Sequence, residues 1–317
     1  MRDTLYLVIP CYNEEEVLPE TRRRLKQKLG DLMAADKISE NSRVVFVDDG
    51  SKDKTWELIK RFHGEDSLFT GISLSRNSGE QNAYIAGLTA SKAYADLMIT
   101  MDADLQDDIN AIDDMIEDYY KGSDIVYGVR SSRKEESFFR KFPARVFYKT
   151  MKRLGTELIP DHSQYRLMSS RAVESLCRYA EVNMFLPALI PLMGYPSSIV
   201  YHERGERFAG KSKYSPGKLI SLSVEAITSF SFKPIQWISL PAALAFAAFA
   251  VSAAAFAIIR IRSGVFEPWP AVAASVWLLL ALQLTAIRII GEYTGKTYIE
   301  TKNRPRYIIA EQLTDSD

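Results

Sequence analysis

Two aspartates one residue apart follow an apolar run that has the length of a β-strand. The run is residues 98–101, and the aspartates are Asp102 and Asp104. Because successive side chains of an extended chain alternate in direction, both carboxylates point the same way, and open α/β sheets bind ligands at the carboxyl ends of their strands. Two carboxylates there suit Mg2+ or Mn2+ carrying a diphosphate. Acidic pairs are also common in solvated turns, so the position at a strand end is what favours a metal site.

Two further strand ends carry polar or acidic residues. Residues 48–51, with the sequence DDGS, end one apolar run and open a helical pattern. Gly50 permits a tight turn there, and Ser51 can cap a helix that begins near Lys52. Taken alone, a plain turn with a helix cap explains this segment. Residues 10–14, with the sequence PCYNE, end the first strand in the same way, so three strand ends could together grip a nucleotide.

The elements that must position these residues alternate through the first half of the chain. We expect strands at residues 5–10, 43–47, 71–74, 98–101 and 124–129, and helices at 14–32, from about 52, at 79–95 and at 109–120. Repeated βα units with apolar strands indicate an α/β fold with a mainly parallel, doubly wound sheet. From residue 131 to about 207 the pattern becomes mixed and basic.

Composition excludes some classes of function. Over 317 residues, 40 lysines and arginines balance 40 aspartates and glutamates, so no overall field favours nucleic acid as a partner. The two cysteines, Cys11 and Cys177, are too few for a disulfide framework and indicate a reducing compartment. Residues 1–4 lead directly into the first strand, so we expect no signal peptide.

Two nearly pure apolar runs, residues 234–260 and 268–287, lie in the last third of the chain. Each is long enough to cross a hydrocarbon core of about 30 Å as a helix. Buried core helices are the alternative, but the runs have no polar face, and Trp237 and Trp269 stand where interfacial anchors are expected. We therefore expect a two-helix transmembrane hairpin at residues 234–292.

Basic residues set the orientation that we expect for this hairpin. They lie outside it on both sides, whereas the connecting loop holds two arginines, and the flanking residues are Lys211, Lys213, Lys218, Lys233, Lys296, Lys302, Arg304 and Arg306. The positive-inside rule then predicts a multi-pass protein of the inner (plasma) membrane with both ends in the cytoplasm. Alanines at 243, 247, 250, 254 and 257 could pack helices closely in a homo-oligomer.

Four motifs, taken in order, resemble one known family. They are residues 9–15 (IPCYNEE), 47–51 (VDDGS), 77–88 (NSG to AGL) and 102–106 (DADLQ). Together they resemble the family 2 glycosyltransferases of the GT-A fold, and more closely the polyprenyl-phosphate sugar transferases, which include dolichyl-phosphate mannose synthase and bacterial undecaprenyl-phosphate glucosyltransferases. The resemblance covers essentially the whole chain, because the apolar hairpin also matches the bacterial branch.

This resemblance implies a domain organisation and an activity. Residues 1–214 would be a cytoplasmic GT-A catalytic domain, 215–233 an amphipathic helix in the membrane interface, and 293–317 a cytoplasmic tail. The reaction would be the inverting transfer of a hexose from a nucleotide sugar to a polyprenyl phosphate, with Mg2+ or Mn2+ as cofactor. UDP-glucose and undecaprenyl phosphate are the expected pair, with GDP-mannose or UDP-N-acetylhexosamine as alternative donors.

The resemblance also assigns residues on the donor side. Asp48 and Asp49 would contact the nucleoside in a pocket lined by Pro10, Tyr12 and Glu14. Asp102 and Asp104 would serve the donor diphosphate, Asp104 and Gln106 through the metal, with Asp102 as a further metal ligand. The catalytic set would be Asp102, Asp104, Gln106, Arg130 and Arg207.

Basic residues would bind phosphate on the acceptor side. The residues that the resemblance points to are Arg130, Arg133, Arg204, Arg207, Lys211 and Ser212. Lipid phosphates and nucleoside diphosphates both need arginine or lysine partners, which agrees with this assignment. A solvated basic face beside anionic lipid is an equal alternative for Arg133 and Arg204.

Gln164 departs from the family pattern, which often has an acid at this position. In related enzymes that act on sugar hydroxyls, an acid in this region serves as the general base. A phosphate acceptor is already ionised at neutral pH and needs no base. Gln164 therefore favours a phosphate acceptor, although altered donor contacts are an alternative.

Three competing functions follow from other features. Residues 205–212 match the P-loop pattern GxxxxGKS, which would indicate an NTPase or transporter subunit. A P-loop runs into a helix, however, and Pro216 would interrupt that helix within about one turn. A scaffold that has lost its chemistry would not need Asp102, Asp104 and Gln106. A processive polysaccharide synthase would carry a QxxRW motif and a larger membrane channel, but the sequence has no such motif and only one short hairpin.

Overall fold

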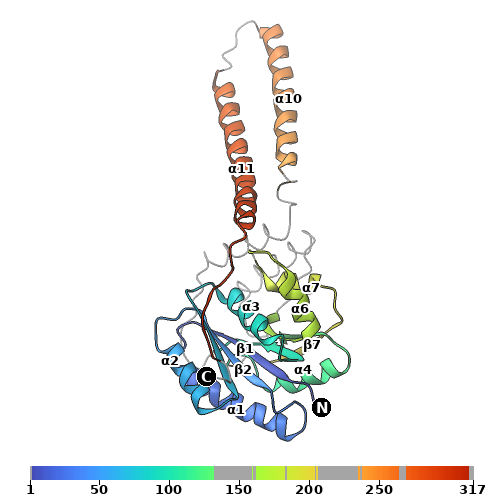
Figure 1. The fold of residues 1–317 in the computed structure, drawn as a ribbon. Coiled ribbons are helices and arrows are strands. Elements are labelled where there is room, and N and C mark those ends of the chain that lie inside the picture. Colours follow the sequence, from blue (N-terminus) through green and yellow to red (C-terminus); the bar gives the residue numbers. More distant parts are fainter. Residues whose placement is uncertain are drawn as a thin grey trace. The chain divides into compact units, whose positions relative to one another are not determined.

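The computed structural model describes residues 2–131, 159, 162–182, 184–203, 205, 235, 238–263 and 269–313. These residues form two compact units. The first unit holds the described residues up to 205 together with 304–313, and the second holds those from 235 to 303. Figure 1 shows a sheet with its helices in the first unit and two long helices in the second.

The first unit is built on an eight-stranded sheet with the order β7-β5-β6-β4-β1-β2-β3-β8. Its strands are β1 (Leu5–Cys11), β2 (Arg43–Asp48), β3 (Phe69–Leu74), β4 (Leu97–Thr100), β5 (Ile125–Arg130), β6 (His162–Ser169), β7 (Ser197–His202) and β8 (Ile309–Gln312). Pairing is parallel from β4 through β1 and β2 to β3, and between β5 and β7. β6 runs antiparallel to both of its neighbours, and β8 runs antiparallel to β3. The predicted mainly parallel α/β sheet is confirmed, with two reversed strands that the βα pattern did not reveal.

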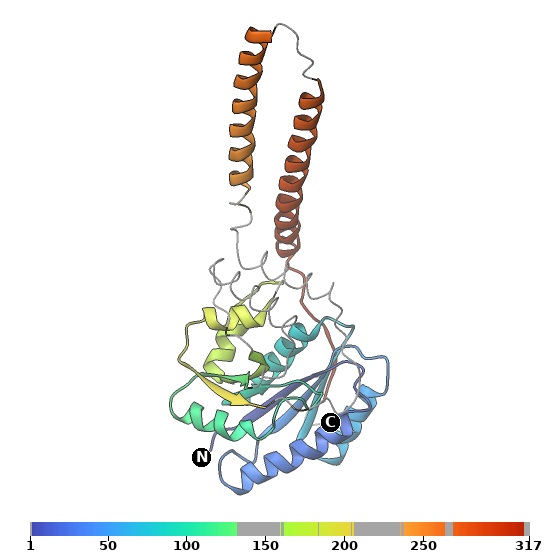
Figure 2. The ribbon, with the colours of Figure 1, turned by 180° about the vertical axis from the view of Figure 1, so that it is seen from behind.

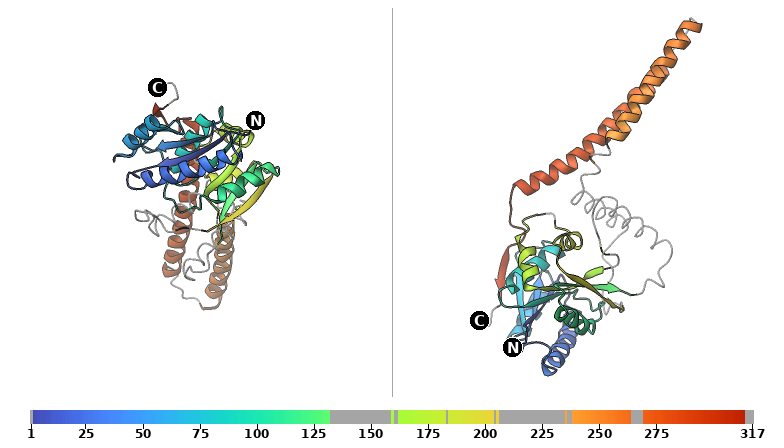
Figure 3. Two further views of the ribbon diagram at one scale, coloured as in Figure 1. Left: turned by 90° about the horizontal axis from the view of Figure 1, so that it is seen from below. Right: turned by 90° about the vertical axis from the view of Figure 1, so that its right-hand side faces the viewer.

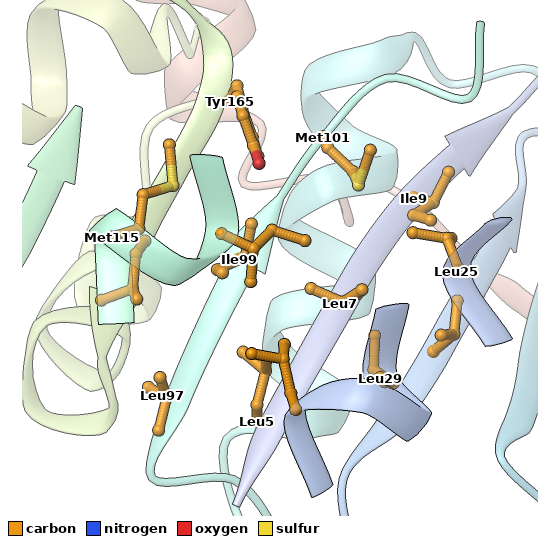
Figure 4. Close-up of a cluster of buried hydrophobic side chains, with 14 of the residues drawn as sticks. Leu5, Leu7, Ile9, Leu25, Leu29, Leu97, Ile99, Met101, Met115 and Tyr165 are labelled. Carbon is orange, nitrogen blue, oxygen red and sulfur yellow. The ribbon is translucent and has the colours of Figure 1, made fainter. Parts of the chain in front are cut away.

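Helices cover both faces of the sheet (Figure 2). Those of the first unit are α1 (Leu18–Ala34), α2 (Thr55–Glu65), α3 (Glu80–Ser91), α4 (Ala111–Tyr120), α6 (Ser170–Arg178) and α7 (Leu186–Leu192). Leu5, Leu7 and Ile9 of β1 pack into a buried cluster with α1 and α4, as Figure 4 shows. The alternate residue Val8 faces α3, where a Cβ on Gly87 would come within 2.4 Å of it. Strands buried on both faces are apolar throughout, which is why the sequence predicted them.

Two predicted helix starts were wrong by three or four residues. The helix expected from residue 14 begins at Leu18, and the helix expected from about residue 52 begins at Thr55. Ser51 is therefore not a helix cap. Its hydroxyl instead accepts a hydrogen bond from the backbone N–H of Asn13 at 2.9 Å. The residues just before α1 and α2 form turns, and the hydrogen bond between Asn13 and Ser51 joins these two loops.

The last strand, β8, covers an edge of the sheet. It pairs with β3 and is the red strand at the sheet edge in the right-hand view of Figure 3. The Glu311 carboxylate accepts a hydrogen bond from Trp56 Nε1 at 2.9 Å and lies 2.8 Å from the ammonium of Lys60. Pairing protects β3 from association with other chains. The tail predicted at residues 293–317 thus contributes a strand to the sheet.

The second unit contains two helices that lie side by side in Figures 1 and 2, α10 (Ser239–Ser263) and α11 (Trp269–Thr301). One stretch among the described residues, Ser275–Thr301, is long and apolar enough to cross a membrane, with a mean hydropathy of 1.4. α10 contains a shorter apolar stretch, Ala243–Ser252. A hairpin that spans the membrane twice therefore stays a prediction. The amphipathic helix predicted at residues 215–233 lies outside the described residues.

Candidate functional site

The loop after β4 alternates between buried and accessible side chains. Ala103 and Leu105 are buried, at 5% and 7% exposure, whereas Asp102, Asp104 and Gln106 are half-buried. This alternation agrees with the expectation that the two carboxylates share one direction. The apolar side chains anchor the loop to the core and leave the polar ones on its accessible side.

Three hydrogen bonds fix the shape of this loop. Gln106 N donates to Asp104 Oδ1 at 3.1 Å, and the Thr21 hydroxyl donates to the carbonyl of Ala103 at 2.9 Å. Gly205 N donates to the carbonyl of Gln106 at 2.9 Å. The start of the basic segment after β7 therefore lies against the loop that carries the aspartates.

Carboxyl groups crowd together around Asp102. The Tyr84 hydroxyl donates a hydrogen bond to Asp102 Oδ1 at 2.7 Å. Burial, followed by the negative charge of Asp107, raises the pKa of Asp102 to about 6. Glu80 lies in the first turn of α3, and its side chain is accessible to solvent. Partial burial of its carboxyl group, followed by the negative charge of Asp102, raises the pKa of Glu80 to about 7. Negative charge in excess of this kind favours the binding of a cation.

A divalent cation fits this set of donors. Asp102, Asp104 and Gln106 offer carboxylate and amide oxygens, which are the hard ligands that Mg2+ and Mn2+ prefer. Within the described part of the chain, no three His, Cys, Asp or Glu side chains converge into a metal cage. An ion at this loop would therefore be held by one or two carboxylates and completed by phosphate oxygens and water, as is usual for Mg2+ with a nucleotide.

Two arginines oppose the negative charge of this cluster. Arg130, the last residue of β5, lowers the pKa of Asp102 against the effect of burial. Arg166 lies on β6 and is 1% exposed, and its charge acts in the same way on Glu80. Its guanidinium donates a hydrogen bond to the amide oxygen of Gln164. Of the two, Arg130 has the accessible side chain, at 27% exposure, and a guanidinium group beside a cation site is suited to bind phosphate oxygens.

The loops after the neighbouring strands β1 and β2 are joined by hydrogen bonds, and β1 is in turn the neighbour of β4 in the sheet. Asn13, which has a left-handed φ of 54°, donates its N–H to the Ser51 hydroxyl and accepts a hydrogen bond from Lys52 N on its side chain at 2.8 Å. Glu14 N donates to the Thr55 hydroxyl at 2.9 Å. These hydrogen bonds hold together the two loops that we expected to bind the nucleoside.

Asp48 and Asp49 are buried at the end of β2, with 2% and 3% exposure. Their carboxylates hold neighbouring loops in place, including the turn that leads into α3. Gly50, with φ of 67°, approaches the backbone of the same turn so closely that a Cβ would lie 2.5 Å from Arg76 C. The partners are Ser51 N and Ser73 Oγ for Asp48, and Ser78 N and Gly79 N for Asp49, at 2.7–3.1 Å.

Comparison with known families shows to which family the chain belongs. The model of the family described as Glycosyl transferase family 2 matches residues 6–176, more than half of the chain. The chain belongs to glycosyltransferase family 2. The mixed α/β sheet of this glycosyltransferase is of the GT-A type, and the matched region contains the three polar strand ends.

Curated relatives align with nearly the whole glycosyltransferase. An uncharacterized glycosyltransferase of Bacillus subtilis, YkoT, is 44% identical over 96% of this chain and 90% of its own length. A prophage bactoprenol glucosyl transferase homolog of Escherichia coli is 34% identical over 96% of this chain and 97% of its own length. The bactoprenol glucosyl transferase of Shigella phage SfII is also 34% identical, over 96% of each chain.

Solved structures resemble the glycosyltransferase more distantly. Glucosyl-3-phosphoglycerate synthase from Mycobacterium tuberculosis is 15% identical, with a TM-score of 0.47 over 72% of this chain and 79% of that one. The mannosyltransferase PcManGT from Pyrobaculum calidifontis, in complex with GDP-Man and Mn2+, is 16% identical, with a TM-score of 0.43 over 90% and 88%. At TM-scores below 0.5, neither likeness informs about the donor or the metal of this glycosyltransferase.

The glycosyltransferase gathers most of the predicted site residues at the carboxyl ends of four strands. Pro10, Tyr12 and Glu14 are half-buried at the end of β1 and in the loop that follows it. The others that the structure places there are Asp48, Asp49, Asp102, Asp104, Gln106 and Arg130. Their roles stay predictions. Outside the described residues lie Arg133, Arg204, Arg207, Lys211 and Ser212, and with them all of the P-loop-like match at 205–212 except Gly205.

Sequence reasoning missed five polar side chains that contact or charge this site. They are Glu80, Tyr84, Asp107, Arg166 and His202. One of them had a usable signal, since Arg166 is a charged residue inside the apolar strand segment 165–168. The others come from elements that the sequence could not bring together.

Proposed function

We propose that this glycosyltransferase transfers a hexose from a nucleotide sugar to a polyprenyl phosphate, with inversion at the anomeric carbon. The observation that carries the proposal is the carboxyl cluster around Asp102, opposed by Arg130, at the carboxyl end of a GT-A sheet. The names of the bactoprenol glucosyl transferase relatives support a lipid phosphate as the acceptor. UDP-glucose and undecaprenyl phosphate are the pair that we expect, with GDP-mannose and UDP-N-acetylhexosamine as alternative donors.

The donor would be held at the ends of β1, β2 and β4. A bound Mg2+ or Mn2+ would supply positive charge to the departing nucleoside diphosphate. Asp104 and Gln106 would hold this ion, with Asp102 as a further carboxylate ligand whose orientation Tyr84 maintains through its hydrogen bond. Arg130 would offer guanidinium N–H groups to phosphate oxygens.

The acceptor phosphate would attack the anomeric carbon in line, from the face opposite to the leaving diphosphate. A phosphate monoester is ionised at neutral pH, so no side chain has to remove a proton. The neutral Gln164, hydrogen-bonded to Arg166, is consistent with this expectation. Catalysis would then depend on the orientation of the two substrates and on stabilisation of the developing charge.

The lipid acceptor agrees with membrane attachment through the second unit. The exposed apolar stretch Ser275–Thr301 supports at least one membrane span. We propose that α10 crosses the membrane as well, that residues 215–233 lie in the interface, and that the catalytic unit is on the cytoplasmic side. Close packing of the alanine-rich α10 against a second copy would give a homo-oligomer.

A transfer assay tests the proposal directly. Membranes that contain the full chain are incubated with undecaprenyl phosphate, a divalent cation and one labelled nucleotide sugar from a panel. The panel contains UDP-glucose, GDP-mannose and UDP-N-acetylglucosamine, and the label is then counted in the lipid phase. We expect label from one donor, and no label from any of them would contradict the proposal.

Two variants give this assay its control. Asp104→Asn should abolish transfer, because the amide replaces the carboxylate that we assign to the cation. Asp114→Asn removes one negative charge from an exposed position on α4 and should leave transfer unchanged. Full activity of Asp104→Asn would disprove the assignment of the metal ligand.

A further inference from the structure

A buried group of side chains lies directly behind Arg130, the residue expected to bind phosphate. Asp107 Oδ1 is 3.4 Å from Arg130 Nη2 and 3.8 Å from His202 Nε2. The Asp107 and His202 side chains are 1% and 0% exposed, whereas the Arg130 side chain is 27% exposed. The guanidinium thus has a carboxylate on its buried side and solvent on its other side.

Several elements fix this group in place. Arg130 and His202 are paired residues at the ends of the parallel strands β5 and β7. The carbonyl of His202 accepts hydrogen bonds from both the N–H and the hydroxyl of Ser131, at 2.9 and 3.0 Å. The Tyr165 ring packs edge-on against the imidazole at 5.3 Å, and its hydroxyl bonds to the carbonyl of Asp108. β5, β6, β7 and the aspartate loop therefore all meet at this point.

The group is nevertheless short of hydrogen bonds. Among the described residues, Asp107 Oδ2, Arg130 Nε and His202 Nε2 are buried and have no hydrogen-bond partner. His202 Nδ1 faces the carbonyl of Glu203 at 3.2 Å, so it has to donate a proton there. Buried polar atoms without partners cost stability, and apolar side chains of similar size would fill the space at a lower free energy. Stability alone does not explain why three polar side chains occupy this position.

We propose that Asp107 and His202 are positioning residues for Arg130, which they hold with one edge of its guanidinium toward a phosphate group of a substrate. This inference rests on the proposed function. Asp107 accepts a hydrogen bond from Arg130 Nη2 on the buried side. The buried imidazole of His202, with its Nε2 3.8 Å from Asp107 Oδ1, packs against Asp107 and limits the space in which the carboxylate can turn. The accessible edge is left to bind phosphate oxygens in the paired geometry that guanidinium groups prefer.

The phosphate could belong to the lipid acceptor or to the diphosphate of the donor. The chemistry is the same in both cases, so separate measurements have to tell them apart. We would measure the binding of a short-chain prenyl phosphate and of UDP to the purified full chain by calorimetry, and KM for acceptor and donor in the transfer assay. An effect confined to one substrate identifies the phosphate that Arg130 contacts.

The test is a double-mutant cycle with Asp107→Asn and Arg130→Ala. We expect Asp107→Asn to weaken one phosphate ligand by about tenfold, as the loss of a charge-assisted contact does, with a smaller change in kcat. In the Arg130→Ala background the same substitution should have less than about a twofold effect, because no guanidinium is left to position. Equal effects in both backgrounds would overturn the proposal.

Matched variants separate positioning from folding. Asp124→Asn alters another aspartate–arginine pair, at the opposite end of β5, in which the aspartate is buried and the arginine is exposed, and it should lower Tm without changing KM. His202→Phe keeps the ring against Tyr165 but removes both nitrogens, so a KM as low as that of the unmodified chain would contradict the role of His202. If the unmodified chain binds both phosphates but transfers no sugar, the proposed function fails while the binding cycle still tests the positioning.

Discussion

Asp124, at one end of the sheet, and Asp102 with Asp107, at the other, are carboxylates in opposite electrostatic environments. At the amino end of β5, Asp124 accepts hydrogen bonds from the Ser169 hydroxyl at 2.8 Å and from two nitrogens of Arg171, and these lower its pKa. At the carboxyl ends of β4 and β5, the pKa of Asp102 and that of Asp107 are both raised, in each case mainly by burial. The chain can satisfy a buried carboxylate where stability is the only requirement.

This difference shows where in the molecule a bound ligand could increase the free energy of unfolding. Negative charges held close together destabilise the folded state until a cation or a proton joins them. Preorganised sites of this kind are common where function and stability compete. The loop after β4 is therefore where a bound cation, a lower pH or neutralisation of Asp102 should increase stability, whereas neutralisation of Asp124 at the amino end of β5 should not.

Among the changes that test this comparison, neutralising Asp102 should have the largest effect. Asp102→Asn keeps an oxygen that can accept the hydrogen bond from Tyr84 but removes a charge, so we expect transfer to fall by about 10²–10³-fold. Tm should rise by a few °C at pH 8, because relief of a carboxylate whose pKa is raised is worth about 1–3 kcal/mol. Transfer assays and thermal unfolding in detergent measure the two effects. A fall in both activity and Tm would mean that the carboxylate stabilises the fold.

Divalent cations should stabilise the unmodified chain more than this variant, which keeps Asp104 and Gln106 but lacks one carboxylate ligand. At 100 times its dissociation constant, an ion that binds only the folded state adds about 2.7 kcal/mol. For a chain of this size the expected rise in Tm is several °C. Thermal unfolding with and without Mg2+ or Mn2+ tests this, with Ca2+ as a check on ion size. Equal rises in the unmodified chain and in Asp102→Asn would show that Asp102 is not a ligand of the ion.

At the amino end of β5, removal of a negative charge should lower the stability of the fold. Asp124→Asn removes the charge from a satisfied pair, and because the Arg171 side chain is 66% exposed we expect a loss of only about 1–2 kcal/mol. Transfer activity at 25 °C should not change. Chemical denaturation and the transfer assay check both statements. A rise in stability would remove the contrast between the two ends.

The smallest effect should be a dependence of stability on pH without divalent ions. The folded pKa values of Asp102 (about 6) and Glu80 (about 7) lie above their ordinary values of 3.8 and 4.5. Between about pH 4 and 7 the folded state therefore binds more protons than the unfolded state, and this contribution to stability grows as pH falls. The pair involving Asp124 acts in reverse, since its pKa is lowered and its contribution is lost only at lower pH.

Thermal unfolding of the unmodified chain and of Asp102→Asn, followed from pH 7.5 to 5, isolates the contribution of Asp102 to this pH dependence. The difference in Tm between the two should shrink as pH falls. Saturating Mg2+ should flatten the curve of the unmodified chain, because the ion competes with the protons. A difference that stays constant over this range would show that Asp102 does not titrate there.

The sheet could be predicted because its strands are buried on both faces. β1, β2 and β4 are continuous apolar runs that end in polar residues, and this pattern alone marked the edge where the site lies. The strand β8 could not be predicted in this way. It has four residues with the sequence IAEQ, all exposed, and only its pairing with β3 makes it a strand.

The site was predicted where its chemistry follows a strand end and missed where it depends on packing. Asp102 and Asp104 are separated by one residue in the sequence, so their common direction could be predicted directly. Asp107 and His202 are 95 positions apart and become neighbours only because β7 pairs with β5. Tyr84 reads as one more large residue on a helix face buried against the sheet, although its hydroxyl reaches Asp102.

The pairing of β8 with β3 also sets an order of events during synthesis. The partners Ile72 and Gln312 are separated by the whole of α10 and α11, so β3 is left as an open edge until those apolar helices have been made. Contacts between such distant residues form late and slowly. While the chain is growing, the nascent sheet exposes an unpaired strand that a chaperone or a second nascent chain could occupy. The first unit is therefore synthesised first but completes its sheet only after α10 and α11 have been made.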